Sequence, residues 1–486
     1  MSQRSPVVAA LPGRGRRHPK TPLLKARLGV LLLVFLADAL AMAVTLPFTP
    51  FLVRAHVTAD RTVGYYSGCL AAAYVLGQAG AAPLWAALAE RAGTKPVLLA
   101  CLLLTSGCLL AFGAAPTLPL ALVARFAQGL CSGNAVIAKG AVADLTDASN
   151  EDDAFVLIGV VFGAGACVGP LLGGALAEPS TKYAWTPALF DQYPYLLPCL
   201  AVAGFSLLVF VTVLCLEETS TTDPLDERQA MHQDEKSRAA SEDRPFAVDV
   251  RGLEVAVAAE DDAPRSLKAL LRDRRCPLLP LLLSFLLCGF SVMAFQEVLP
   301  LYARASVKEG GLGLSTTGVG ALQGLAGLAT LAGVAYGPLS NPPSAYEAAL
   351  LLCGLFAYPL PALVAAYAPH WAFAAVAAAA AALSAETAFT SLNAMLKRTA
   401  PAELAGAALG AASSLGLAGF ALGPVAGGCV FAAASDPAVS LPSALRKGRL
   451  AFVVLAALAL LNSRLVASLP AWPARGQAWR RPRPPS

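Results

Sequence analysis

The sequence has few charged residues and few histidines, and it lacks the short motifs that common enzymes share. Asp, Glu, Lys and Arg make up only 14% of the 486 residues, whereas soluble domains carry about 25%. A Walker loop with its lysine, a G-x-S-x-G turn and an H-E-x-x-H pair are absent. We therefore expect no enzymatic activity, no cofactor and no ATP-driven pumping, which leaves a gradient, such as that of protons, as the energy source.

Metal ligands are also scarce. The four histidines do not cluster, and the 11 cysteines lie almost entirely in apolar runs, with no pair in zinc-ligand spacing. Cysteines in such runs are typically small packing residues, so we predict no metal site. The net charge of +5 lies largely in the two tails, where basic residues set membrane orientation, and it does not indicate a nucleic-acid partner.

Hydrophobic residues are abundant instead, at 57% of the chain, and the mean hydropathy is +0.62. Charged residues gather in the stretch 217–275, and most of the remainder forms apolar runs. About 20 helical residues cross the roughly 30 Å of hydrocarbon in a bilayer. The sequence therefore predicts an all-α membrane protein with twelve spans, near 28–53, 63–88, 96–115, 118–142, 154–177, 193–215, 277–303, 312–338, 344–368, 371–396, 403–432 and 448–468.

A proline-glycine cassette, G-x-x-x-G-P-x-x-G-G, occurs twice, about 254 residues apart. Glycines spaced by four leave a bare stripe on a helix, which lets two backbones approach closely, and proline is tolerated in membrane helices. Matching spans of this kind in two halves indicate a duplicated helix bundle, the architecture of a transporter. The first cassette comprises Gly165, Gly169, Pro170, Gly173 and Gly174; the second comprises Gly419, Gly423, Pro424, Gly427 and Gly428, with Gly410 nine residues before Gly419.

The charge pattern divides and orients the chain. The first 27 residues contain seven Arg or Lys and no acid, which favours a cytoplasmic N-terminus, although an organelle transit peptide would have the same composition. An even number of spans then returns the C-terminus to the cytoplasm. The predicted parts are a basic tail (1–27), a six-helix bundle (28–216), a disordered cytoplasmic linker (217–275), a second six-helix bundle (276–469) and a second basic tail (470–486).

The loop between the second and third predicted spans carries a charged motif. Residues 86–95 read A-A-L-A-E-R-A-G-T-K, which resembles the signature G-x-x-x-D-R-x-G-R-K of the major facilitator superfamily, with Ala and Glu in place of its Gly and Asp. This resemblance implies a cytoplasmic latch whose ion pairs break and form as the two halves rock. An ordinary interfacial charge cluster is the alternative. The expected latch residues are Glu90, Arg91, Gly93, Lys95, Lys139 and Asp144.

Further residues resemble particular branches of this superfamily. Asp38, Tyr74 and Gln78 look like those of tetracycline/proton antiporters, and Arg125-Phe126-Ala127-Gln128-Gly129 is similar to the R-x-x-Q-G motif. Glu297 and the stretch 169–219 look like zinc-induced facilitator-like proteins of plants. The resemblance implies twelve helices in two pseudo-symmetric bundles, transport by alternating access, and a vacuolar or plasma membrane.

Ionisable residues inside apolar spans are the candidates for coupling. A carboxylate in hydrocarbon costs several kcal/mol when charged and usually marks a transport pathway. Asp38 and Glu297 stand at positions where the resemblance implies proton transfer, whereas Glu386 has no such match and is as readily structural. Arg125 is a buried cation that a carboxylate or an anionic substrate group would pair.

Uncharged polar residues in the spans either line the substrate cavity or join helices by hydrogen bonds. The candidates are Tyr74, Gln78, Gln128, Gln323 and Asn393. The sequence thus predicts a monomeric membrane transporter of a small organic solute, coupled to protons. Two alternatives are a uniporter of a charged solute and a non-transporting receptor or scaffold that works through the linker 217–275.

Overall fold

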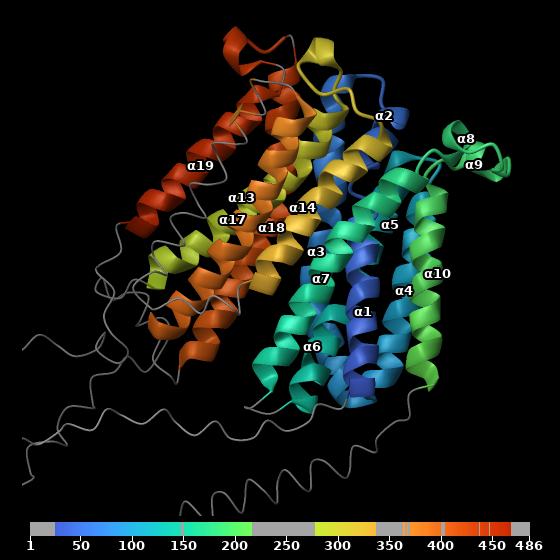
Figure 1. The fold of residues 1–486 in the computed structure, drawn as a ribbon, viewed down its shortest axis with the longest axis vertical. Helices are drawn as coiled ribbons and strands as arrows, with labels where there is room; N and C mark the ends of the chain where they lie inside the picture. Colours follow the sequence, from blue (N-terminus) through green and yellow to red (C-terminus); the bar gives the residue numbers. More distant parts are fainter. Residues whose placement is uncertain are drawn as a thin grey trace, which may run out of the picture.

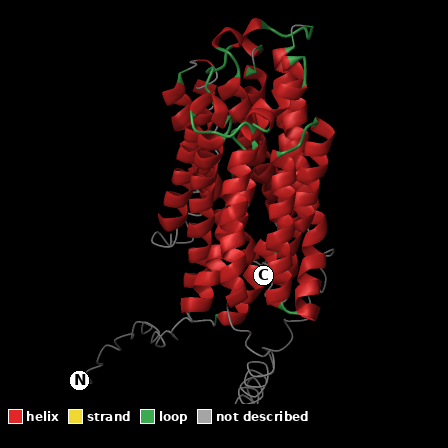
Figure 2. Cartoon of the chain, turned by 90° about the vertical axis from the view of Figure 1, so that its right-hand side faces the viewer, coloured by secondary structure: helices red, strands yellow, loops and turns green. Residues whose placement is uncertain are grey.

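The computed structural model describes residues 25–146, 150–215, 278–336, 363–364, 367, 370–399, 404–436, 438–446 and 448–467. All regular structure in these residues is helical (Figure 2). Eleven of their helical segments are long and apolar enough to cross a membrane, which confirms the predicted all-α class. The ninth predicted span, 344–368, falls almost entirely outside the described residues. So do residues 1–24, the linker 217–275 and the tail 470–486.

Two groups of helices lie side by side (Figure 1). The N-terminal bundle comprises α1 (Lys25–Ala43), α2 (Thr49–His56), α3 (Asp60–Ala92), α4 (Thr94–Gly113), α5 (Leu118–Cys131), α6 (Asn134–Leu145), α7 (Glu151–Leu176), α8 (Pro179–Lys182), α9 (Leu189–Gln192) and α10 (Leu196–Cys215). The C-terminal bundle comprises α13 (Leu278–Arg304), η1 (Val307–Glu309), α14 (Thr316–Tyr336), α17 (Trp371–Thr399), α18 (Ala405–Ser435), η5 (Ser443–Leu445) and α19 (Arg449–Ala467).

The two ends of the molecule differ. We call the end that carries α2, α8 and α9 the far end, and the end where α1 begins the near end (Figure 1). The bundles touch at the far end and separate toward the near end in this view. One hydrophobic core reaches across both bundles near the far end, because buried Phe48 and Phe112 belong to the same cluster as Phe295 and Phe452. The bundles therefore meet through apolar packing as well as polar contacts.

Two of the predicted spans are interrupted helices, although Leu118–Leu145 still counts as a single candidate membrane span. Residues 28–53 are not one helix: α1 ends at Ala43, five residues form turns, and α2 begins at Thr49. Pro47 lies in this turn, and the fully buried Phe48 ring stacks on Tyr195 of the neighbouring chain segment at a centroid distance of 5.3 Å. Residues 118–142 are likewise divided, because α5 ends at Cys131 and α6 begins at Asn134.

The two cassettes pack in equivalent ways. In α7 a side chain at Gly169 would strike Ala43 of α1, and in α18 one at Gly423 would strike Phe290 of α13. The last glycine of each cassette instead faces the other bundle: Gly174 meets Thr316 and Gly320 of α14, and Gly428 meets Gly64 of α3. The predicted close approach is confirmed for both stripes, and both helices continue through Pro170 and Pro424.

Two seams therefore join the bundles, α7 against α14 and α3 against α18. Gly163 and Leu331 are also in contact at the first seam, as are Gly68 and Pro424 at the second. Gly410 differs from the cassette glycines, because nothing lies within 4 Å of the place where its side chain would be.

Candidate functional site

Asp38 lies in the middle of α1 and is 7% exposed. Its Oδ1 accepts a hydrogen bond from Ser132 Oγ at 2.9 Å and a longer one from Asn134 Nδ2 at 3.5 Å. Ser132 Oγ is also 3.2 Å from the Tyr74 hydroxyl, and Gln78 Nε2 donates to Ser132 Oγ at 3.1 Å. Three helical segments thus contribute one connected polar network around a single buried carboxyl group.

The network exists because the fourth span is broken at Ser132 and Gly133. A side chain at Gly133 would collide with the Trp85 ring of α3, which fills the space beside the break. Trp85 Nε1 donates to the Leu130 carbonyl at 2.7 Å, and Thr105 Oγ1 of α4 donates to the Cys131 carbonyl at 3.2 Å. Side chains from two helices therefore satisfy carbonyls that a continuous helix would have paired within itself.

The break also turns the start of α6 toward Asp38. Asn134 is the first residue of α6, and its side chain donates to the carboxyl group. The N-terminus of a helix carries a partial positive charge, which favours a carboxylate nearby. Broken helices whose ends face a buried ionisable group are typical of transporter sites near the membrane midplane.

Arg125 of α5 is 4% exposed. It donates to Gln128 Oε1 at 2.7 Å and to the Met42 carbonyl at 3.3 Å, while Gln128 Nε2 donates to the Ala41 carbonyl at 3.2 Å. The guanidinium carbon lies 4.6 Å from the centre of the Tyr74 ring, a cation–π geometry. In the described part of the chain Arg125 has no carboxylate within ion-pair distance, so the expected pairing with a buried acid is not seen.

Tyr74 connects the two groups. The Tyr74 hydroxyl belongs to the Asp38 network, and the face of the Tyr74 ring contacts Arg125. The structure therefore brings together five of the predicted site residues and adds two. The predicted ones are Asp38, Tyr74, Gln78 and Arg125 with its partner Gln128, and the added ones are Ser132 and Asn134.

Glu297 lies in the other bundle, on α13, and is 6% exposed. Its Oε1 is buried without a hydrogen-bond partner among the described residues. Gln323 on α14 is 7% exposed, and its Oε1 likewise has no partner within the described ranges. Buried polar atoms without hydrogen-bond partners are uncommon in folded proteins.

Two other candidates are less informative. Asn393 donates to the Phe389 carbonyl of its own helix at 2.9 Å, the local bond expected of a structural polar residue in a helix. The side chain of Glu386 lies outside the described residues, although its backbone belongs to α17. Asn393 makes no hydrogen bond to the Asp38 network among the described residues.

The predicted latch residues lie on α3, α4 and α6. Glu90 and Arg91 are exposed at the near end of α3, and Lys139 and Asp144 are exposed on α6. Gly93 has φ 91° and ψ 151°, a conformation open to glycine, and it allows α3 to turn directly into α4. Latching itself stays a prediction.

Sequence reasoning missed Ser132 because serine in an apolar run is common and its partner lies 94 positions away. The available signal was the triplet Cys131-Ser132-Gly133 directly after the R-x-x-Q-G motif, since small residues there permit a helix break. No group of three or more potential metal ligands occurs in the described ranges.

Comparisons with known proteins identify the family of the chain. A family model described as the Major Facilitator Superfamily matches residues 31–357. The chain is 28% identical to Protein ZINC INDUCED FACILITATOR-LIKE 1 of Arabidopsis thaliana over 313 residues, covering 62% of this chain and 60% of that protein. It is 29% identical to the class H tetracycline resistance protein of Pasteurella multocida over 196 residues, or 40% and 46% of the two chains. The chain thus spans about three fifths of the first curated relative.

Solved structures share the fold. The crystal structure of the human organic anion transporter MFSD10 (TETRAN) has a TM-score of 0.59 at 19% identity, covering 92% of this chain and all of that one. A bacterial homologue of the human lysosomal transporter Spinster, in an inward-facing and occupied conformation, has a TM-score of 0.65 at 15% identity, covering 92% and 97%. At these identities the similarity concerns the arrangement of helices alone.

Proposed function

This chain belongs to the Major Facilitator Superfamily, and from that premise we propose that it is a secondary transporter that exchanges a small organic solute against protons. The observation that carries the proposal is the Asp38 network at the break in span four. A charged carboxyl group inside a membrane protein is costly, and such groups usually mark a substrate or proton pathway. Here the Asp38 carboxyl group is also connected by hydrogen bonds, through Ser132, to polar side chains of a neighbouring helix.

Protonation has a direct mechanical consequence in this geometry. A carboxylate accepts the Ser132 and Asn134 hydrogen bonds, whereas a protonated carboxyl group presents one hydroxyl donor and less acceptor capacity. Ser132 lies between α5 and α6, so a change in its bond to Asp38 alters the junction of the two half-helices. Proton binding at Asp38 is thereby coupled to the position of α6 and its exposed residues Lys139 and Asp144.

The solute binds between the bundles in this proposal. Arg125 and Gln78 lie on the N-terminal side, and Glu297 and Gln323 on the C-terminal side. Relatives whose names denote resistance to tetracycline support an organic solute, and the absence of a metal-ligand group among described residues argues against free metal as cargo. The near end would face the cytoplasm, and a vacuolar or plasma membrane would hold the protein.

Proton coupling is tested in proteoliposomes that contain a pH-sensitive dye, with tetracycline as the probe solute. Adding tetracycline outside should drive its entry in exchange for protons leaving the lumen, so the dye inside should report a rise in pH with the wild-type protein. Asp38→Asn should abolish this signal, and Asp191→Asn, which changes an exposed carboxyl group on α9, should leave it intact. Unchanged gradient-driven uptake in Asp38→Asn would remove Asp38 from the coupling path.

Uniport of a cation is the second candidate, and the unpartnered Oε1 of Glu297 favours it. A cationic solute would supply the positive charge that could pair with the Glu297 carboxylate. Flux that carries the solute's own charge and does not depend on a pH gradient would select uniport over exchange. Deleting residues 225–262 of the linker distinguishes these two transport functions from a scaffold function. A transporter should keep its transport activity without those residues.

A further inference from the structure

Lys182 occupies an unusual place at the far end of the α7/α14 seam. It is the last residue of α8, directly beyond the end of α7. Its ammonium donates to the Ala177 carbonyl at 2.6 Å, to the Gly174 carbonyl at 2.7 Å and to Thr316 Oγ1 at 2.8 Å. Two of these short bonds stay within the N-terminal bundle, and the third crosses to the first residue of α14.

Thr316 completes the crossing. It is fully buried, and its hydroxyl accepts from Lys182 and donates to Glu178 Oε2 at 3.4 Å. Its neighbour Thr317 donates back to the Gly174 carbonyl at 3.2 Å. The approach depends on Gly174, because a side chain there would lie 2.5 Å from the Thr316 carbonyl oxygen. A single hydroxyl thus joins a cation and an anion of the opposite bundle.

The charges match the helix ends that they face. Lys182 binds carbonyls at the C-terminus of α7, where a helix carries partial negative charge, and Glu178 approaches the N-terminus of α14, where a helix carries partial positive charge. Glu178 adopts a left-handed backbone with φ 53°, which a residue other than glycine seldom does without compensation. Burial lowers the pKa of Lys182, and the negative charge of Glu178 opposes this effect. The two carbonyls and the Thr316 hydroxyl therefore replace the water that the ammonium group has lost.

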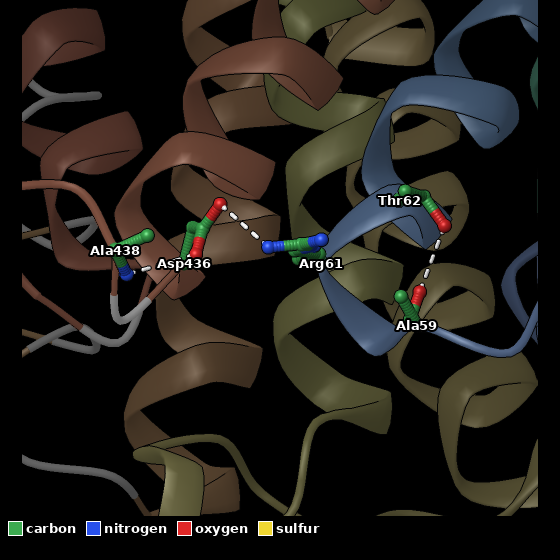
Figure 3. A network of polar contacts seen from close by, with 5 residues as sticks. All are labelled: Ala59, Arg61, Thr62, Asp436 and Ala438. Atoms are coloured by element: carbon green, nitrogen blue, oxygen red, sulfur yellow. Dashed lines mark hydrogen bonds and ion pairs between the residues drawn. The ribbon is translucent and has the colours of Figure 1, made fainter.

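The other seam has a counterpart with different chemistry. Asp436 follows α18 and corresponds to Lys182 under the shift that relates the cassettes. It forms an ion pair with Arg61, near the start of α3, at 3.4 Å (Figure 3). A local bond from Ala438 N to Asp436 Oδ1 fixes the acid. Arg61 is 55% exposed, so solvent screens its ion pair with Asp436. The hydrogen bonds of the buried Thr316 hydroxyl are not screened in this way.

From these contacts we propose that Glu178, Lys182 and Thr316 form a clasp that holds the far end of the transporter closed, and that this clasp must separate whenever the far end opens. The inference rests on the alternating-access function proposed above. Lys182 and Glu178 act as positioning residues: they set the balance between the closed and open far end. The Arg61–Asp436 pair is the weaker closure at the second seam.

Hydrogen–deuterium exchange of the full chain in phosphatidylcholine nanodiscs tests the clasp without any transported solute. Thr316→Val removes the crossing hydroxyl at almost constant volume and leaves the Lys182 ammonium without its third short acceptor. Amides at the end of α7 and the start of α14 should exchange roughly tenfold faster or more, since a lost bond to a charged group shifts an equilibrium by that order. Amides at the near end, at 142–145 of α6, should become slower because opening one end closes the other.

Two further variants complete the design. In a Lys182→Met background, Thr316→Val should have a smaller effect than in the wild type, because the bond between Lys182 and Thr316 is already lost and only the longer bond to Glu178 remains to be broken. Tyr183→Phe is the matched control. It removes a bond of 3.1 Å to the Ala175 carbonyl at the end of α7, which lies within the same bundle and does not cross the seam, and it should leave near-end exchange unchanged.

Opposite changes at the two ends establish the clasp even if tetracycline transport proves absent, so failure of the proposed function can be recognised separately. Exchange that rises equally at both ends in Thr316→Val would mean general loosening and would overturn the clasp. Wild-type exchange in Thr316→Val, or an equal two-ended response in Tyr183→Phe, would overturn it as well.

Discussion

Replacing one seam glycine with alanine should separate the two bundles, and the second cassette supplies its own control. Gly428 and Gly410 lie on the same helix, α18. A side chain at Gly428 would overlap the Gly64 carbonyl of α3, which is backbone and cannot rotate away, whereas one at Gly410 meets nothing within 4 Å. The same substitution therefore tests a tight contact at one position and open space at the other.

The magnitude follows from two terms. Alanine is favoured over glycine inside a helix by up to about 1 kcal/mol, and both variants gain this amount. Forcing an extra methyl into a packed interface costs about 1–3 kcal/mol, and only Gly428→Ala bears this cost. The two variants should therefore differ in unfolding free energy by about 1–3 kcal/mol, with Gly410→Ala equal to or above the wild type.

Thermal unfolding in one detergent, followed by tryptophan fluorescence, measures the ranking of the three proteins. Exchange at the start of α3 adds local information, because Gly428→Ala should raise it and Gly410→Ala should not. If Gly428→Ala proved as stable as Gly410→Ala, the close backbone contact between α3 and α18 would not exist as described, and the equivalence of the two seams would fail with it.

Three other outcomes follow from the polar contacts. Trp85→Phe keeps the ring but removes the donor to the Leu130 carbonyl, so it should destabilise the protein by about 1 kcal/mol, seen as a lower midpoint of thermal unfolding. Ser132→Ala should reduce proton-coupled uptake of tetracycline roughly tenfold, and Ser132→Thr, which keeps the hydroxyl, should retain most of it; equal loss in both would point to packing at the break. Arg61→Gln should change stability by less than about 1 kcal/mol, and this difference should vanish in 1 M salt; a larger, salt-independent effect would show that the pair with Asp436 is not a screened surface contact.

The sequence predicted the architecture because duplication and hydrophobic runs leave a strong pattern. Glycines at intervals of four fix which face of α7 and α18 is bare, but not which helix fills it. That Gly174 and Gly428 face the opposite bundle, unlike the glycines before them, depends on how the bundles are placed. This is a property of tertiary packing, and periodicity does not contain it.

The candidate site was predictable in part for a similar reason. Asp38 and Arg125 stand out as charges in apolar surroundings, so composition alone identifies them. Their separate partners, Ser132 for Asp38 and Gln128 for Arg125, depend on the break in span four. That break arises from Trp85 packing against Gly133, a contact between residues distant in sequence, and hydropathy favours an uninterrupted helix there.

Isotope exchange provides the most direct test of the claim that a proton on Asp38 drives transport. Proteoliposomes that contain Asp38→Asn should still exchange labelled for unlabelled tetracycline at equal concentrations, because this half-reaction needs no net proton movement. They should fail to accumulate tetracycline when a pH gradient is imposed, whereas the wild type accumulates it. Accumulation by Asp38→Asn at the wild-type level would contradict the account.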